Sequence, residues 1–285
     1  MPELLSEFRA NAGPQSAFLQ SEAYIRGYGG AMGGGKSRAM SEQMFDYMLQ
    51  YPGMVGIMAR QRHTSITETT KKTMLGQVVP SSLIARKKES GGEDYIELIN
   101  GSVCHFIGLE DPVRWFSAEI SVLMVDQVEE CEQDTIVKMM TRLRWPIAPK
   151  SFYTGRLAEV DPKDFSIKVI DVEDFEMNGK VVLSFNPENP DHWLQKWFFV
   201  GANPTKYGYQ KSELTVNDAD FPIGNCEFFF ASALDNPHTG ADYVARLAGQ
   251  PAHLRRRYLE GVWEFISGEC FFDNDALQHY STVVE

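Results

Sequence analysis

A glycine-rich segment at residues 30–37, Gly-Ala-Met-Gly-Gly-Gly-Lys-Ser, matches the pattern G-x-x-x-x-G-K-[ST] at every required position. In such a loop, consecutive backbone N–H groups at a helix N-terminus can surround a phosphate group. Lys36 would reach the β- and γ-oxygens of a nucleoside triphosphate, and the Ser37 hydroxyl would ligate Mg²⁺. An apolar run before the segment and a helix-compatible segment after it argue against a chance match in a surface loop. The predicted phosphate-binding residues are Gly30, Gly33, Gly34, Gly35, Lys36 and Ser37.

A second signal is the apolar run at residues 120–125, which ends at Asp126 about ninety residues after the phosphate loop. A strand buried on both faces of a parallel sheet would deliver this carboxylate to the sheet edge beside the phosphates, where it would hold Mg²⁺. The next polar residues are Gln127, Glu129 and Glu130. Gln127 can orient a water but cannot accept its proton, so either Gln127 positions the water, or Glu129 or Glu130 supplies a carboxylate, or hydrolysis is slow. The two acids also suit the first turn of a helix over residues 131–143.

Three arginines are candidates for stabilising charge on a transferred phosphoryl group. Arg142 and Arg144 end the helical segment, where basic residues are also expected on electrostatic grounds alone. They would act within the subunit or across an interface. Arg114 lies in the loop that enters the strand ending at Asp126 and could project outward.

Two carboxamides are candidates for contacts to a nucleotide. Gln15 opens a short helical segment upstream of the phosphate loop and could donate to and accept from an adenine edge, although it could equally be solvated. Asn186 follows the apolar strand 181–184 and could sense a γ-phosphate, or simply form a turn with Pro187.

The apolar runs alternate with helical segments, which predicts an α/β fold with a mainly parallel central sheet. Further strands are expected at residues 23–28, 54–58 and 226–230, and Asn100-Gly101 predicts a hairpin with a type I′ turn. Met40, Met44 and Met48 form a helical stripe that we assign to the core. The remaining expectations are a capping box over residues 65–68, a hairpin or insertion over residues 152–178, and helices over residues 240–249 and 251–260.

The bulk composition fits an ordinary globular protein of 285 residues, with 43% hydrophobic and 23% charged residues. The net charge of −12 argues against passive charge-driven binding to nucleic acid, but not against a motor with basic groups on one face. No run is long enough to span a membrane, and the four scattered cysteines suggest reduced cytosolic thiols.

The order of the motifs resembles the ATPase domain of the large terminases of tailed bacteriophages, over about residues 8–272. Walker motifs alone fit many families, whereas the downstream elements are more specific. The matching elements are Asn11 with Gly13-Pro14-Gln15, residues 30–37, Val125-Asp126 with Glu129-Glu130, Arg142-Leu143-Arg144, Ser184-Phe185-Asn186-Pro187, His192-Trp193, Asp235-Asn236-Pro237, and residues 259–263.

This resemblance implies a P-loop NTPase of the ASCE type that hydrolyses ATP with Mg²⁺, with an ATPase core at residues 1–231 and a small lid segment at residues 232–285. It implies that residues 184–186 couple hydrolysis to movement. The implied partners are double-stranded viral DNA, the portal of the procapsid and the small terminase subunit. The implied assembly is a homo-oligomeric ring, expected to be a pentamer, formed in the host cytoplasm from a chain that is a monomer in isolation.

The chain also departs from the pattern of that family. Many members carry an arginine inside the phosphate loop, where Ala31-Met32 stands here, and a Glu where Gln127 stands. The nuclease part of large terminases would begin near Glu285, and Asp273 and Asp275 are too few for its metal cluster, so we expect no DNA cleavage. Two other hypotheses are a helicase-like ASCE ATPase and a nucleotide-dependent assembly module with little hydrolysis of its own.

Overall fold

The computed structural model describes residues 8–90, 92–144, 156–160, 167–171, 179–216 and 221–265. Cys270, Asp273, Asp275 and the rest of the predicted lid segment beyond residue 265 lie outside these ranges. The predicted insertion at residues 152–178 is described only at β7 (Arg156–Val160) and β8 (Ile167–Asp171), which pair antiparallel as a hairpin.

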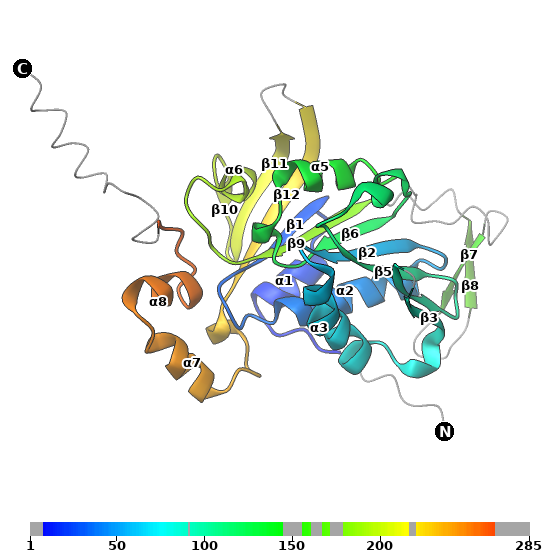
Figure 1. Ribbon diagram of the computed structural model, residues 1–285, viewed down its shortest axis with the longest axis horizontal. Helices are drawn as coiled ribbons and strands as arrows, with labels where there is room; N and C mark the ends of the chain where they lie inside the picture. Colours follow the sequence, from blue (N-terminus) through cyan, green and yellow to red (C-terminus); the bar gives the residue numbers. More distant parts are fainter. Residues whose placement is uncertain are drawn as a thin grey trace, which may run out of the picture.

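Apart from the β7–β8 hairpin, the described strands form one large sheet whose centre is parallel (Figure 1). The six strands from β12 to β5 in the sheet order all run in the same direction, which confirms the prediction of a mainly parallel sheet. Their carboxyl ends therefore meet at one edge, where open α/β sheets bind ligands. The order is β10 (Asn203–Pro204), β11 (Gly208–Val216), β12 (Phe221–Ala231), β1 (Ile25–Gly30), β9 (Lys180–Phe185), β6 (Val122–Val125), β2 (Val55–Arg60), β5 (Val103–Gly108), β4 (Glu93–Leu98) and β3 (Ile84–Ser90).

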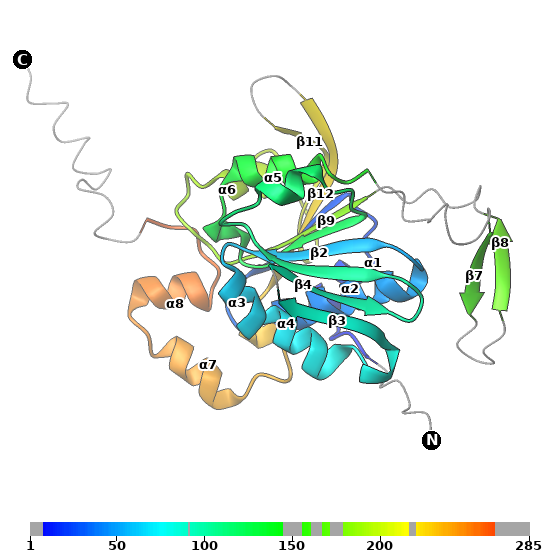
Figure 2. The same ribbon diagram turned by 45° about the vertical axis from the view of Figure 1, so that its right-hand side comes forward.

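Helices cover both faces of this sheet (Figures 1 and 2). One face carries α1 (Pro14–Gln20), α2 (Lys36–Gln50), α3 (His63–Glu68), α4 (Thr70–Thr73) and the π-helical turn η1 (Met74–Val78), and the other carries α5 (Gln133–Met140) and α6 (Trp193–Phe198). The methionine stripe of α2 is fully buried against the sheet, as predicted. After β12, the helices α7 (Ala241–Ala248) and α8 (Ala252–Tyr258) lie together at one side of the sheet.

Two local predictions were wrong because distant contacts decide the outcome. Helix α3 begins at His63, not at the predicted capping box, because the Glu110 carboxylate accepts a hydrogen bond from the His63 backbone N–H at 3.0 Å. The hairpin between β4 and β5 exists, but its turn is not of type I′, because of the two turn residues only Gly101 has a positive φ (+81°). The side chain of the other, Asn100, donates to the carbonyl of Met48 at 2.7 Å.

The helix predicted over residues 131–143 begins later than expected. Glu129 and Glu130 lie in the separate 3₁₀ turn η4 (Val128–Glu130), and α5 starts only at Gln133. The two acids therefore do not serve the first turn of α5.

Within the described part of the chain, no helix combines the length and apolar character needed to cross a membrane. The cysteines described there, Cys104, Cys131 and Cys226, are buried and form no disulfide.

The packing of α2 predicts that truncating two apolar side chains of this helix lowers the free energy of unfolding by very different amounts. Met44 is fully buried and its Sδ lies over Gly56 of β2, whereas Leu49 is 42% exposed. Met44→Ala should lower the free energy of unfolding by about 2–5 kcal/mol, because it leaves a cavity between helix and sheet. Leu49→Ala, the matched control, should change it by about 0.5 kcal/mol or less. Urea denaturation measures both, and equal losses would contradict the assignment of α2 to the core.

Candidate nucleotide-binding site

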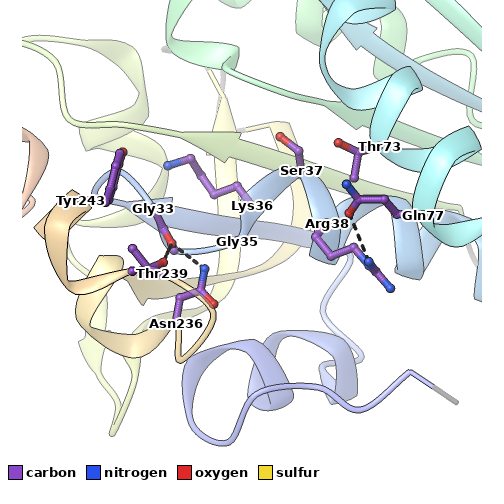
Figure 3. Close-up of a pocket in the computed structure, with 12 residues that line it drawn as sticks. Gly33, Gly35, Lys36, Ser37, Arg38, Thr73, Gln77, Asn236, Thr239 and Tyr243 are labelled. Carbon is purple, nitrogen blue, oxygen red and sulfur yellow. Dashed lines mark hydrogen bonds between the residues drawn. The ribbon is translucent and has the colours of Figure 1, made fainter.

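The phosphate loop connects β1 to α2 at the carboxyl edge of the sheet. Gly33 and Gly35 have φ values of +78° and +77°, which only glycine adopts readily. At Gly34 a Cβ atom would stand 2.9 Å from the carbonyl oxygen of Ala231, so β12 leaves no room for a side chain. The loop borders an open cavity of about 480 Å³ (Figure 3), lined by Gly33, Gly34, Gly35, Lys36, Ser37, Arg38, Thr73, Gln77, Asn236, Thr239, Gly240 and Tyr243.

The Lys36 ammonium group lies where a triphosphate chain would pass. Its Nζ donates to the carbonyl of Ala31 at 2.6 Å and to Oδ1 of Asn186 at 2.7 Å. Burial lowers the pKa of Lys36, because the charged form loses hydration. An anionic phosphate beside Nζ would restore a charge partner for this lysine.

The Asp126 carboxylate gathers three hydroxyl groups from three different elements. It accepts hydrogen bonds from Ser37 at 3.2 Å, from Thr70 of α4, and from Ser184 of β9. Carboxylate and hydroxyl oxygens are ligands suited to Mg²⁺, so these residues fit the metal that accompanies a nucleotide. Thr70 was missed in the sequence, where no local pattern links it to Asp126.

Glu129 lies beside Lys36 and is joined to it through Asn186. Oε1 of Glu129 accepts from Nδ2 of Asn186 at 2.9 Å and from the Asn186 backbone N–H at 3.1 Å. Its second oxygen, Oε2, is buried and contacts no hydrogen-bond donor among the described residues. Burial raises the pKa of Glu129 to about 7. A carboxyl group with this pKa and one free oxygen is suited to accepting a proton near neutral pH.

The backbone of Gln127 sets the direction of η4, the turn that carries Glu129. Gln127 is the only residue other than glycine with a positive φ in the described ranges, at φ 54° and ψ 52°. Its N–H donates to Ser184 Oγ at 3.3 Å, which holds the unusual conformation in place. The left-handed kink makes η4 possible and turns Glu129 back toward Asn186, while Glu130 stays exposed. The geometry therefore favours Glu129 over Gln127 and Glu130 as the group beside the phosphates.

His192 and Trp193 hold the same turn from the opposite side. His192 Nδ1 accepts from the backbone N–H of Leu194 at 3.3 Å, so the ring is bound to Glu129 by Nε2–H, which lies 3.2 Å from the Glu129 carbonyl. Trp193 Nε1 donates to the carbonyl of Cys131 at 3.2 Å. These contacts give the His-Trp pair a positioning role.

Gln15 packs against Gly35 of the phosphate loop. It is buried, and its Nε2 would be 3.3 Å from a Cβ atom at Gly35. Its Oε1 already accepts from the backbone N–H of Asn11 at 2.8 Å. The side chain of Asn11 in turn contacts Oδ1 of Asn236 at 3.4 Å. Adenine recognition by Gln15 stays a prediction.

The segment after β12 is tied to the loop at several points. Asn236 Nδ2 and Thr239 Oγ1 both donate to the carbonyl of Gly33, at 2.8 and 3.2 Å (Figure 3). The backbone N–H of Met32 donates to the carbonyl of Tyr258 at 2.7 Å. Arg257 of α8 is buried, donates to the carbonyl of Pro187 at 2.7 Å and pairs with Glu188. This segment therefore contacts both the phosphate loop and the residues that follow Asn186.

Arg142 and Arg144 lie at the wrong edge of the sheet to reach their own phosphate loop. The carbonyl of Arg142 accepts from the N–H of Ile120, which precedes β6. From Ile120 to Asp126 the strand direction covers roughly 20 Å at about 3.3 Å per residue. A role within the subunit does not fit this placement, so contact across an interface and a purely electrostatic role at the helix end are the two readings that remain.

Arg114 lies at the same edge as the loop but several strands away. It is exposed, covers the ring of Trp115 at 4.8 Å, and approaches Gly92 at the turn between β3 and β4. Three strands lie between β1 and β5, so the two are four strand spacings apart, or roughly 19 Å at about 4.8 Å per spacing. Its place on the surface suits contact with another subunit.

Comparison with known proteins matched no family model and no curated protein, but it did match solved structures. The large terminase from a thermophilic bacteriophage aligns with a TM-score of 0.60 and 12% identity, over 94% of this chain and 57% of that chain. The same protein in complex with ADP aligns equally well. The ATPase domain of the Thermus phage P74-26 large terminase aligns with a TM-score of 0.53 and 14% identity, over 93% of this chain and 96% of that chain.

The chain has the fold of a phage large-terminase ATPase domain. This confirms the ASCE-type α/β fold class, and it supports the resemblance found in the motif order at the level of the fold. The chain spans a little over half of the thermophilic bacteriophage terminase, at 57% of its length, so the activity of that whole protein does not transfer to it directly.

The buried carboxyl group of Glu129 makes a specific prediction about how stability depends on pH. The pKa of Glu129 is raised from its ordinary 4.5 to about 7, so the folded protein holds this proton more tightly than the unfolded chain does. The stabilisation is fully present below about pH 4.5 and is lost as the pH rises through 7. Relative to the wild type, Glu129→Gln should therefore gain stability between pH 5 and pH 8 in urea denaturation. If the two proteins differ by the same free energy of unfolding at every pH in this range, burial of an ionisable Glu129 is contradicted.

Proposed function

We propose that this chain is the ATP-hydrolysing domain of a viral DNA-packaging motor. The observation that carries the proposal is the arrangement of Lys36, Asn186 and Glu129 in one hydrogen-bonded row beside Asp126, on a terminase-type fold. A cation for phosphate, a carboxylate for a metal and a second carboxyl group with a raised pKa are the groups that phosphoanhydride hydrolysis requires.

The residues have separate roles in this reaction. Lys36 would exchange its contacts with Ala31 and Asn186 for oxygens of the β- and γ-phosphates. Ser37 and Asp126 would hold Mg²⁺, which neutralises phosphate charge when bound. Glu129 would take a proton from the attacking water, with Asn186 fixing its orientation and donating toward the γ-phosphate.

The motor role and its partners are proposed from the resemblance in motif order, which the terminase-type fold supports. The thermophilic bacteriophage terminase was solved with ADP and with ATP-gamma-S, which supports ATP as the nucleotide. The proposal includes double-stranded viral DNA, the portal, the small terminase subunit and a homo-oligomeric ring, expected to be a pentamer, in the host cytoplasm. Arg114, Arg142 or Arg144 would act on the site of a neighbouring subunit, since none approaches its own loop.

This distance of the three arginines also favours a second candidate, an assembly module that binds ATP with little hydrolysis as a monomer. The two candidates differ in turnover. Both require the phosphate loop, so one variant tests what they share.

Lys36→Ala should remove ATP hydrolysis and weaken ATP binding by at least tenfold, because Lys36 is the one cation that the loop supplies. Phosphate release and calorimetric ATP titration measure the two effects, and circular dichroism checks the fold. Lys72→Ala, at an exposed lysine of α4, is the matched control. Unchanged binding and turnover in Lys36→Ala would refute the phosphate-loop assignment. A wild-type chain that binds ATP but does not hydrolyse it would favour the assembly module.

Glu129→Gln should lower the turnover number by a factor on the order of 10² or more while ATP still binds, because the carboxamide cannot accept a proton. Glu132→Gln, which changes an exposed acid just after the turn, serves as the control for the loss of one negative charge. If Glu129→Gln retains full activity, the role passes to Gln127 or Glu130.

A further inference from the structure

Arg60 is a buried cation at the carboxyl end of β2, next to the proposed metal site. Its side chain is only 9% exposed. In the sheet, Ala59 is the partner of Val125, and the backbone N–H of Asp126 donates to the carbonyl of Ala59 at 2.8 Å. Arg60 and Asp126 are therefore neighbours at the ends of adjacent strands.

The guanidinium group is incompletely paired. Nη1 donates to the hydroxyl of Thr69 at 3.1 Å, and Nη2 lies 4.0 Å from a carboxylate oxygen of Glu130, a side chain that is 48% exposed. Nε is buried and contacts no acceptor in the described part of the chain. A buried guanidinium normally has hydrogen-bonded anionic partners, because leaving its charge uncompensated is costly.

The neighbouring acid does not supply this compensation. The Asp126 carboxylate is occupied by the hydroxyls of Ser37, Thr70 and Ser184. The link from Arg60 to that carboxylate runs only through Thr69, whose hydroxyl lies 3.4 Å from that of Thr70. The edge of the sheet thus holds a cation with an unused donor on the strand next to the carboxylate that would hold Mg²⁺.

We propose that Arg60 binds the γ-phosphate of ATP within its own subunit. The inference rests on the proposed function, because it assigns a further residue to the same site. Arg60 lies on the side of Asp126 away from β9 and the phosphate loop, so it would approach the terminal phosphate from the side opposite Lys36. Its unused N–H groups would complete their hydrogen bonding on phosphate oxygens, for which a guanidinium is well matched.

The proposal predicts an effect on the γ-phosphate alone. Isothermal titration of the full chain with Mg-ADP and with Mg-ATP-γ-S compares ligands without and with this group. Arg60→Ala should weaken binding of Mg-ATP-γ-S by about tenfold or more and change binding of Mg-ADP by less than about twofold. Arg62→Ala, at the exposed arginine two residues later, is the matched control and should leave both affinities unchanged.

Two further variants separate this role from a structural one. Arg60→Lys keeps the buried charge and should lose several-fold affinity for Mg-ATP-γ-S only, which preserves the test if Arg60→Ala does not fold. Glu130→Gln removes the nearest carboxylate and should not reproduce the loss. The inference is overturned if the Arg60 variants retain wild-type affinity for Mg-ATP-γ-S, if they lose both ligands equally, or if Glu130→Gln has the same effect. A wild-type chain that binds neither nucleotide would instead refute the proposed function itself.

Discussion

The carboxamide of Asn186 is the contact on which the geometry of the site depends. Its oxygen accepts from Lys36, its nitrogen donates to Glu129, and its backbone N–H donates to the same carboxylate oxygen. An amide can serve a cation and an anion at once because it carries both a donor and an acceptor. Aspartate or leucine at this position would satisfy at most one of the two neighbours. The carboxamide therefore fixes how far apart the two charged groups stay before a phosphate enters.

The position of Glu129 depends in turn on the backbone of Gln127. A left-handed residue other than glycine costs free energy, and here the hydroxyl of Ser184 compensates by accepting its N–H. Because Ser184 also donates to Asp126, one side chain of β9 links the Asp126 carboxylate to the turn that carries Glu129. The contacts of His192 and Trp193 hold the far side of that turn. The proposed metal ligand and the proposed proton acceptor are thus positioned by the same two strands.

The sequence was sufficient for features that are local. The phosphate loop, the strand ending at Asp126 and the buried stripe of α2 follow from spacing and hydrophobicity over a few residues. Thr70 was not identifiable as a neighbour of Asp126, because this contact arises only when α4 folds against the sheet. The sequence places Arg60 at the carboxyl end of a strand, where open α/β sheets bind ligands, but not its incomplete pairing, which depends on contacts from other elements. Glu129 could not be chosen over Glu130 without the kink at Gln127. The position of Arg142 and Arg144 at the far edge follows from topology, since a helix after a parallel strand runs back to the opposite edge of the sheet. Their role across an interface stays a prediction.

The same topology explains why the phosphate loop is approached both by the ends of the sheet strands and by the segment after β12. The ends of β9, β6 and β2 supply Asn186, Asp126 and Arg60, so the sheet alone brings acids, amide and cation to one edge. The segment after β12 reaches that edge separately, through Asn236 on Gly33 and Arg257 on the carbonyl of Pro187. Since Pro187 directly follows Asn186, any shift of Asn186 on release of Lys36 must be accommodated by the Arg257 contact. The Arg257 contact therefore connects helix α8 to the residue next to Asn186, so a displacement of Asn186 would be transmitted to a helix outside the sheet.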